Sequence, residues 1–301
     1  MAEIRYDGRV AIVTGAGGGL GRAYALLLAS RGARVVVNDL GGATDGTGSG
    51  ATMAESVVNE IKQAGGQAVP DYNSVLDGAA TVKTAVDAYG QVDILINNAG
   101  ILRDITFLKQ SNQDWDLVLD VHLNGTRNVT KAAWPVMRER KYGRIVNTTS
   151  SAGLYGNFGQ SNYSAAKMGI AGLTNTLRLE GANYNIKVNT LAPVAGSRLM
   201  AQVMPQELLD ALRPEFVAPL VAYLCSEECK ESGYIYSVGG GYFSRVAYFE
   251  GKGVFLGTDQ EIRIEDVASR MLDINDLRKG TEMTQAQDQT RKVLNFMGLD
   301  R

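Results

Sequence analysis

Tyr163 and Lys167 are the residues of this sequence best suited to acid–base chemistry, because a phenol and an ammonium lie four positions apart. In a helix, positions i and i+4 project from the same face. A free tyrosine has a pKa near ~10, and a neighbouring cation stabilises the phenolate and lowers that pKa toward the working range of a general base. Ser150 precedes Tyr163 by thirteen residues, and its hydroxyl could hold the reacting oxygen. Spacing alone leaves a simple surface pair open, because i,i+4 pairs are common on helices.

A glycine-rich turn, Thr14 to Gly21, could bind the phosphates of a nucleotide. Glycines let the backbone approach a pyrophosphate closely, and the N–H groups and dipole of a following helix attract its negative charge. An ordinary glycine-rich turn between a strand and a helix is the alternative. Asp39 lies twenty-four residues after Gly15, where a carboxylate can accept hydrogen bonds from the adenosine ribose hydroxyls. A 2′-phosphate would be repelled there, so Asp39 favours NAD over NADP, although Arg22 is a nearby cation.

Short β-branched runs alternate with longer segments of helical periodicity along most of the chain. The predicted strands are residues 10–13, 34–38, 67–73, 92–97, 143–148, 186–191 and 234–238. The predicted helices are residues 20–31, 53–64, 79–89, 114–140 and 162–183. The strands are apolar on successive residues, and each crossover is long enough for a right-handed βαβ unit. The pattern therefore predicts an α/β fold with a doubly wound, seven-stranded parallel sheet covered by helices on both faces.

Two segments fall outside this alternation. Residues 41–50 hold five glycines and lie between the second strand and its helix, so they form either a flexible linker or a loop beside the ligand edge of the sheet. Toward the C-terminus the alternation stops, and only residues 264–277 and 284–297 show helical patterns. We therefore expect a dinucleotide-binding domain over residues 1–241 and a helical C-terminal extension over residues 242–301.

The composition is that of a globular protein with a small-molecule partner. The chain has 301 residues, of which 45% are hydrophobic and 21% charged, and this excludes global disorder. Thirty basic residues against 32 acidic ones give a net charge of −2, so there is no electrostatic case for binding nucleic acid or a membrane surface. No apolar stretch approaches the ~20 residues of a membrane-spanning helix. Cys225 and Cys229 lack the spacing of a zinc or redox pair, so we expect no metal and a reducing, cytoplasmic location.

Four motifs occur in the order and at the spacing of one known family: Thr14-Gly-x-x-x-Gly-x-Gly21, Asn97-Asn98-Ala99-Gly100, Ser150 and Tyr163-x-x-x-Lys167. On these residues the chain resembles the short-chain dehydrogenase/reductase family, from residue 6 to about residue 241. The resemblance implies a single Rossmann-type domain that binds NAD. It also implies that Tyr163 is the catalytic base, that Lys167 binds the nicotinamide ribose and lowers the tyrosine pKa, and that Ser150 orients the substrate oxygen.

The resemblance further implies a set of cofactor contacts, with some departures from the family pattern. The implied contacts are Gly15, Gly19, Leu20, Gly21, Asp39, Ser74, Val75, Asn97, Ala99, Gly100, Tyr163, Lys167, Pro193 and Ser197. Ser74 stands where the family usually has an aspartate. His122, the only histidine, stands where an asparagine usually supports a water-mediated proton relay from the lysine. An imidazole can both donate and accept a proton, so His122 is either a catalytic relay residue or a packed helix histidine.

Five further stretches narrow the resemblance: residues 5–10, 37–42, 98–104, 155–160 and 195–198. They are similar to the (3R)-hydroxyacyl-CoA dehydrogenase part of the type 2 peroxisomal multifunctional enzymes and to bacterial single-domain relatives. This implies NAD-dependent oxidation of (3R)-3-hydroxyacyl-CoA to 3-ketoacyl-CoA, a homodimer built on the two long helices, and an extension packed near the active site or the dimer interface. A peroxisomal location would follow in a eukaryote, although the C-terminus lacks Ser-Lys-Leu.

Two other functions stay open. The same chemistry would serve a 17β-hydroxysteroid, which the sequence does not separate from an acyl-CoA. A protein with this fold could also bind a nucleotide as a non-catalytic scaffold, against which the complete catalytic set argues. An acyl-CoA would bring phosphates that need cations, and Arg103, Arg198 and Arg245 are candidates that could equally be solubilising surface charges.

Overall fold

The computed structural model describes residues 2–196 and 205–299. Contacts between Cα atoms divide the chain into a larger unit, Met1–Arg245, and a smaller unit, Val246–Arg301. The larger unit contains the predicted sheet and its helices, and the smaller one contains most of the predicted extension.

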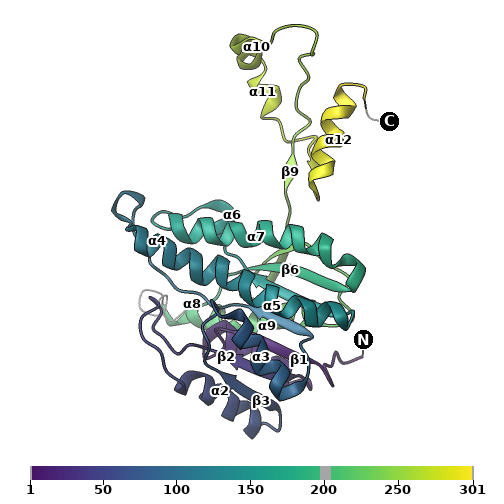
Figure 1. Cartoon of the computed structure of the whole chain (residues 1–301). Coiled ribbons are helices and arrows are strands. Elements are labelled where there is room, and N and C mark those ends of the chain that lie inside the picture. Colours follow the sequence, from purple (N-terminus) through teal and green to yellow (C-terminus); the bar gives the residue numbers. More distant parts are fainter. Residues whose placement is uncertain (1, 197–204, 300–301) are drawn as a thin grey trace. The chain divides into compact units, whose positions relative to one another are not determined.

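An eight-stranded sheet forms the centre of the larger unit (Figure 1). Its strands are β1 (Val10–Thr14), β2 (Arg34–Asn38), β3 (Gln67–Asp71), β4 (Ile94–Asn97), β5 (Gly143–Thr148), β6 (Ile186–Pro193), β7 (Ile235–Gly239) and β8 (Tyr242–Val246). The strand order is β3-β2-β1-β4-β5-β6-β7-β8, and every neighbouring pair from β3 to β7 is parallel. The predicted doubly wound, Rossmann-type parallel sheet is therefore confirmed.

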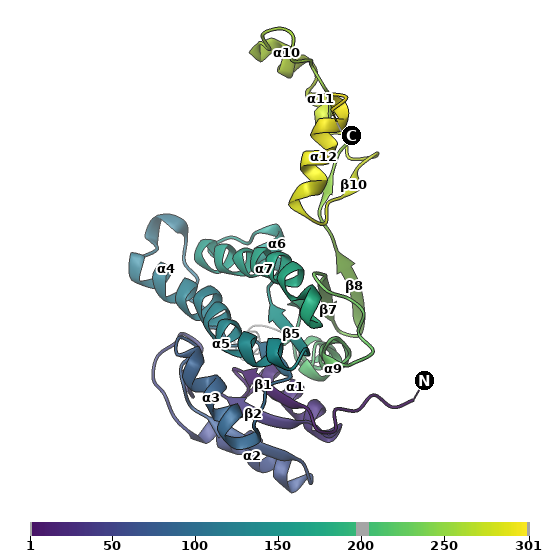
Figure 2. The ribbon, with the colours of Figure 1, turned by 45° about the vertical axis from the view of Figure 1, so that its right-hand side comes forward.

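The eighth strand, β8, was not expected from the sequence. It follows β7 after only Gly240 and Gly241, which both have positive φ angles, of 55° and 79°. A link of two residues allows only an antiparallel return, and glycine adopts positive φ without strain. Figure 2 shows β8 running beside β7 at the end of the sheet. The sequence did not predict this hairpin, because the run of three glycines before β8 indicated the end of the domain.

Helices cover both faces of the sheet, as predicted. The helices of the larger unit are α1 (Gly19–Ser30), α2 (Thr52–Gln63), α3 (Gly78–Tyr89), η1 (Phe107–Lys109), α4 (Asn112–Leu119), η2 (Asp120–Asn124), α5 (Gly125–Glu139), α6 (Ser151–Tyr155), α7 (Ser161–Gly181), η3 (Ala182–Tyr184), α8 (Gln206–Ala211), η5 (Pro214–Phe216) and α9 (Ala218–Cys225). Helices α1, α2 and α9 pack on one face, and α3, α5 and α7 on the other.

The core is split by the sheet into two apolar clusters. Successive strand residues point to opposite faces. Ala11 and Val13 of β1 therefore join the cluster beneath α1, whereas Val10 and Ile12 join the cluster beneath α3 and α5. All four side chains are fully buried. Because both faces of the sheet are buried, successive strand residues must all be apolar. The continuous apolar runs in the sequence therefore predicted the strands.

The long helix predicted over residues 114–140 is interrupted. A π-helical turn, η2, separates α4 from α5 and contains His122. A π turn adds a residue to the helix and rotates the side chains that follow it, and such turns occur frequently at functional sites. By contrast, α7 is continuous over 21 residues.

The smaller unit contains α10 (Ile264–Ser269), α11 (Met271–Ile274), α12 (Ala286–Phe296) and an antiparallel ribbon of β9 (Phe249–Glu250) and β10 (Thr281–Glu282). The ribbon was missed because two-residue strands leave no periodic signal. Within the described residues of this unit only Gly251 is buried, so no side chain is. Large apolar side chains such as Ile264 and Leu272 are exposed, at 84% and 91%. The unit therefore lacks an apolar core of its own.

Candidate active site

A cavity of about 310 Å³ lies at the carboxyl ends of the strands of the larger unit. It is lined by residues that follow β1, β2, β3 and β4: Gly15, Gly18, Asn38, Asp39, Leu40, Gly42, Ala43, Thr44, Gly46, Met53, Asn73, Ser74, Val75, Leu76, Asn98, Ala99, Gly100, Ile101, Leu117 and Val121. The strand order reverses between β1 and β4, so their loops diverge there and leave a crevice. We call this cavity the cleft.

The glycine-rich turn forms one wall of the cleft. Gly15 has a φ of 62°, and a Cβ there would come within 2.8 Å of the Cα of Ala99. A Cβ on Gly21 would overlap the carbonyl oxygen of Gly15. Helix α1 begins at Gly19 without a side-chain cap and without an acidic residue in its first turn. Its first N–H groups are therefore available to an anionic group such as a pyrophosphate.

Asn98 and Thr14 fix this wall, and neither was singled out among the predicted contacts. The Asn98 side-chain amide donates to the carbonyl oxygens of Thr14 and Gly15, at 3.0 and 3.1 Å. The Thr14 hydroxyl accepts from the backbone N–H groups of Asn98 and Ala99, at 3.0 and 3.1 Å. These bonds tie the end of β1 to the end of β4. The doubled asparagine was the available signal, but only the fold shows which of the two faces the turn.

Asn97 differs from its predicted place. Its side-chain amide donates to Thr130 Oγ1 at 2.9 Å and to Asn147 Oδ1 at 2.8 Å, and its side chain is buried between strands and helix. It therefore does not line the cleft, which Asn98 does instead. The reason is the period of two along β4, which turns neighbouring side chains to opposite sides.

Asp39 lies in the cleft as predicted, with both carboxylate oxygens held. Oδ2 accepts from the Gly17 N–H at 2.8 Å, and Oδ1 accepts from the Gly41 N–H at 2.7 Å. Each ionised carboxylate oxygen can accept more than one bond, so both keep capacity for ribose hydroxyls. The carboxylate is thus oriented by the backbone on either side of it.

The glycine-rich loop of residues 41–50 also lines the cleft, which supports the ligand-edge interpretation over a flexible linker. The Thr44 carbonyl accepts from Leu102 N at 2.9 Å. Arg103 donates to the Asp45 carbonyl at 2.8 Å and pairs with Asp114 at 2.7 Å. These contacts fasten the loop to the segment that follows β4, and they engage the Arg103 guanidinium within the protein.

The other predicted cofactor contacts fall in several places. Ser74, Val75, Ala99 and Gly100 line the cleft. Gly19, Leu20 and Gly21 form the first turn of α1, and Pro193 ends β6. Ser197 lies outside the described residues, as does the candidate phosphate ligand Arg198. Arg245, the remaining cation candidate, stacks on the ring of Tyr234, with its guanidinium carbon 4.0 Å from the ring centroid.

Ser150, Tyr163 and Lys167 are brought together where β5 ends. Ser150 is the N-cap of α6, and its hydroxyl accepts from Ala152 N at 3.2 Å. Tyr163 lies in the first turn of α7, which packs on α6. Lys167 is one turn further along α7, is only 3% exposed, and has Nζ 5.5 Å from the centroid of the Tyr163 ring. The helix spacing therefore places the phenol and the ammonium side by side, as predicted.

The pKa values of this pair differ from the sequence-based expectation. Burial raises the pKa of Tyr163, and a hydrogen bond with the Ser150 side chain acts in the opposite direction. Burial also lowers the pKa of Lys167 from 10.5 to about 7. The ammonium donates to the Thr148 carbonyl at 2.7 Å rather than to the phenol. The Tyr163 pKa is therefore shifted opposite to the expected direction: burial is the largest influence on it, and Lys167 is not among the groups that shift it.

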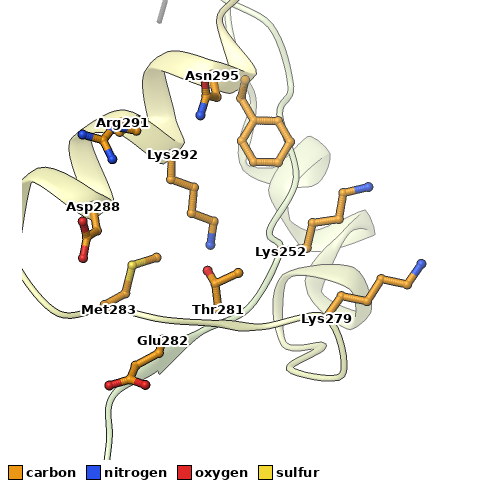
Figure 3. Close-up of a pocket in the computed structure, with 10 residues that line it drawn as sticks. Lys252, Lys279, Thr281, Glu282, Met283, Asp288, Arg291, Lys292 and Asn295 are labelled. Carbon is orange, nitrogen blue, oxygen red and sulfur yellow. The ribbon is translucent and has the colours of Figure 1, made fainter.

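A separate hollow of about 470 Å³ lies in the smaller unit, between α12 and β10 (Figure 3). Lys292 points into it, but its ammonium donates to the Gly251 carbonyl and lies 3.4 Å from the Glu250 carboxylate. Lys252 and Lys279 extend away from Lys292. The cations around this hollow therefore do not converge on one point, as the binding of a phosphate would require.

Within residues 2–196 and 205–299, no three His, Cys, Asp or Glu side chains gather in a way that could hold a metal ion. In the same part of the chain no helix has the length and hydrophobicity to cross a bilayer.

Comparison with known proteins identifies close relatives. A family model described as short chain dehydrogenase matches residues 9–207. A Mycobacterium tuberculosis protein named as a short-chain type dehydrogenase/reductase is 57% identical over 272 residues, which cover 89% of this chain and 94% of that protein. Peroxisomal multifunctional enzyme type 2 from Drosophila melanogaster is 50% identical over 283 residues, which cover 93% of this chain but only 47% of the larger enzyme.

Solved structures also resemble this chain, and two of them illustrate the similarity. That of the full-length Drosophila enzyme has a TM-score of 0.84 and 43% identity, covering 98% of this chain and 51% of that one. The second is 7α-hydroxysteroid dehydrogenase in complex with NADH and 7-oxo glycochenodeoxycholic acid. Its TM-score is 0.70 and its identity 30%, covering 79% of this chain and 95% of that chain. The Drosophila enzyme is thus about twice as long as the part that this chain matches.

The buried ammonium of Lys167 makes the free energy of unfolding depend on pH. The unfolded chain keeps the lysine proton up to a pH of about 10.5, whereas the folded chain loses it near pH 7. Between these values the unfolded state binds more protons, so stability increases as pH rises, by at most ~1.4 kcal/mol per pH unit.

Lys167→Met should remove this increase. Urea unfolding between pH 7 and about pH 9.5 measures it, with Lys131→Met at an exposed position of α5 as the control. Parallel pH profiles for wild type and Lys167→Met would contradict the assigned burial effect.

Proposed function

The chain belongs to the short-chain dehydrogenase family, and we propose that it oxidises (3R)-3-hydroxyacyl-CoA to 3-ketoacyl-CoA with NAD as the hydride acceptor. As a member of this family it is an oxidoreductase that uses a nicotinamide dinucleotide. One observation carries the proposal: the hydroxyls of Ser150 and Tyr163 and the buried ammonium of Lys167 meet at the edge of the sheet that also forms the cleft.

The cleft fits a dinucleotide. Gly15 leaves room for a close approach of the backbone, and the uncapped first turn of α1 leaves N–H groups for a pyrophosphate. Asp39, already oriented by two backbone N–H groups, would accept from the adenosine ribose. An ionised carboxylate there repels a 2′-phosphate, and this supports NAD over NADP.

The reaction removes a hydride from the carbinol carbon and a proton from its hydroxyl. When bound, the nicotinamide supplies the hydride acceptor. Ser150 donates a hydrogen bond to the substrate oxygen, and Tyr163 accepts the hydroxyl proton as its phenolate while the ketone forms. Lys167, whose ammonium is fixed on the Thr148 carbonyl, would hold the nicotinamide ribose beside them. Because burial raises the pKa of Tyr163, the rate of oxidation should rise with pH through the alkaline range.

Exposed apolar side chains in the two segments that follow β4 and Ser150 support a substrate with an apolar chain. Phe107, Leu108, Tyr155 and Phe158 form this apolar rim, in the segments that follow β4 and Ser150. The two segments are joined by a bond of 2.8 Å from the Ile105 N–H to the Gly159 carbonyl. Burying such side chains against an acyl chain contributes roughly 25 cal/mol per Å² of apolar surface.

The names of relatives support the same chemistry. Besides the Drosophila enzyme, they include a Neurospora crassa protein named peroxisomal hydratase-dehydrogenase-epimerase, which is 52% identical over 262 residues, or 29% of its length. The chain would supply the dehydrogenase of such enzymes. We propose a cytoplasmic location, or a peroxisomal one if the source is a eukaryote.

One exposed face of α7 supports a homodimer. Ala165, Met168, Gly172, Thr176 and Leu179 are exposed at intervals of three or four residues and carry no charge. Because α7 packs against the sheet on one side only, its exposed side is left to contact a second copy of the chain. The small side chains on that side permit close helix packing.

The smaller unit also supports an assembly. With no buried side chain in its described part, it cannot offset the conformational entropy of its own folding. We therefore propose that the C-terminal extension packs near an active site or the dimer interface, where its exposed apolar side chains become buried.

The catalytic role is tested by replacing the phenol. Tyr163→Phe should lower kcat by about 100-fold or more, the usual contribution of general base catalysis, and leave NAD binding unchanged. The assay follows NADH formation from (3R)- and (3S)-3-hydroxyacyl-CoA of short and long chains and from estradiol. Tyr184→Phe, at a half-buried tyrosine outside the site, is the control.

We expect turnover of the (3R) esters only, with higher kcat/KM for long chains. Turnover confined to estradiol would favour the 17β-hydroxysteroid alternative, and no turnover of any alcohol would favour the non-catalytic scaffold. A fully active Tyr163→Phe enzyme would contradict the assigned base.

Cofactor choice is tested at Asp39. Asp39→Ala should weaken NAD binding about tenfold or more, because hydrogen bonds to a charged group are worth ~1.5–3 kcal/mol. The same change should raise the affinity for NADP relative to that for NAD. Titration of both cofactors by fluorescence measures the ratio. Asp45→Ala, at an exposed aspartate of the same loop, is the control. An unchanged ratio would mean that Asp39 does not contact the ribose.

The dimer is tested on α7. A Cβ at Gly172 meets no atom within 4 Å, so an arginine there does not disturb a single copy. Light scattering should give about twice 32.3 kDa for wild type and the monomer mass for Gly172→Arg. Ala79→Arg adds the same charge at an exposed position of α3 and should stay dimeric. A monomeric wild type would refute the proposed interface.

A further inference from the structure

The only histidine of the chain, His122, is buried beside the candidate catalytic residues. It lies in the π turn η2 and is 2% exposed. Its Nδ1 atom is buried and has no hydrogen-bond partner among the described residues.

The first contact of His122 is with the wall of the cleft. Its Nε2 lies 2.8 Å from the carbonyl oxygen of Ile101 and 3.1 Å from the backbone nitrogen of the same residue. In one tautomer Nε2–H donates to the carbonyl, and in the other Nε2 accepts from the N–H. Either bond fixes the backbone of Ile101, which lines the cleft. A Cβ on Gly100 would overlap Cε1 of His122, so glycine at this position makes room for the ring.

The second contact is with the phenol ring. The rings of His122 and Tyr163 are perpendicular, at 90°, with their centroids 5.1 Å apart. Edge-to-face packing of this kind restricts the orientation of both rings. The imidazole thus touches the cleft wall on one side and the candidate base on the other.

The surroundings of His122 keep it neutral. Burial, assisted by the charge of Lys167, lowers its pKa to about 3. Tyr163 and Lys167, both on α7, are the titratable groups that face it, while the segment of Gly100 and Ile101 presents backbone groups. An imidazole that cannot take up a proton near neutral pH is poorly suited to relay one.

We propose that His122 is a positioning residue, whose imidazole fixes the backbone of Ile101 in the cofactor cleft and the phenol ring of Tyr163 through two separate contacts. Of the two roles that the sequence left open for His122, a proton relay and a packed helix histidine, the proposal takes the second and gives it a function, and it rests on the proposed dehydrogenase function. The two contacts predict that cofactor binding and turnover can be changed separately.

Two substitutions separate the contacts. His122→Phe keeps a ring against Tyr163 but loses the bond to Ile101, so KM for NAD should rise about tenfold while kcat changes little. His122→Gln carries an amide that reaches the position of Nε2 but has no ring, so kcat should fall about tenfold while KM for NAD changes little. Thr81→Val is the control. It removes a different buried polar atom without a partner, the Thr81 hydroxyl on α3, and should change neither KM nor kcat.

His122→Asn distinguishes positioning from a relay. Its amide reaches only as far as Nδ1 and supplies neither contact, so positioning predicts losses in both KM and kcat. A relay predicts the reverse pattern for kcat. His122→Asn should then keep kcat, because an asparagine usually supports the relay at this position, and His122→Phe should lose it, because phenylalanine cannot pass a proton. That reverse pattern, or wild-type constants in all three variants, would overturn the proposal.

A second measurement does not depend on turnover. Because the chain has one histidine, ¹⁵N-labelled imidazole in a protein without a histidine tag gives a single set of ring signals. These should show one neutral tautomer with no titration between about pH 5 and pH 8, and should shift when NAD binds, because Ile101 lines the cleft. Titration within that range, or signals unaffected by NAD, would overturn the proposal. If no alcohol is turned over, the dehydrogenase function fails, and these signals still test the contact with Ile101.

Discussion

Burial of titratable side chains in one place is the constraint on which the site depends. Tyr163, Lys167 and His122 lie within one cluster around the start of α7. Exclusion of water raises the pKa of Tyr163 and lowers those of Lys167 and His122, so it favours the neutral form of each side chain. The larger unit maintains this cluster because α6, α7 and η2 pack closely around the end of β5. The low-dielectric surroundings strengthen every remaining interaction, including the bond from Lys167 to the Thr148 carbonyl.

Close backbone approach performs the equivalent task in the cleft. Gly15 and Ala99 are near enough that no side chain could stand between them, and Asn98 bonds the two loops together. Asp39 is held by N–H groups from both sides. These contacts are all made within the chain itself, and a site whose loops are fixed in this way has less conformational freedom to lose on binding. The smaller unit differs from the larger one in this respect, because its described part buries no side chain.

Several features could be read from local sequence. The apolar runs predicted the parallel strands, and the glycine-rich turn with Asp39 predicted the cleft, because these signals depend on neighbours along the chain. The spacing of Tyr163 and Lys167 predicted that they share a helix face. The hairpin of β8 and the ribbon of the smaller unit were missed, since short, glycine-flanked strands resemble loops.

Sequence by itself determined which groups are available and which element carries each of them. Tertiary structure alone decided their directions: Asn98 rather than Asn97 faces the cleft, Lys167 donates to a carbonyl of β5, and the π turn aims His122 between Ile101 and Tyr163. The reason is physical. Orientation and protonation are set by contacts between residues 19 to 85 positions apart and by exclusion of water, and neither is encoded in a local pattern.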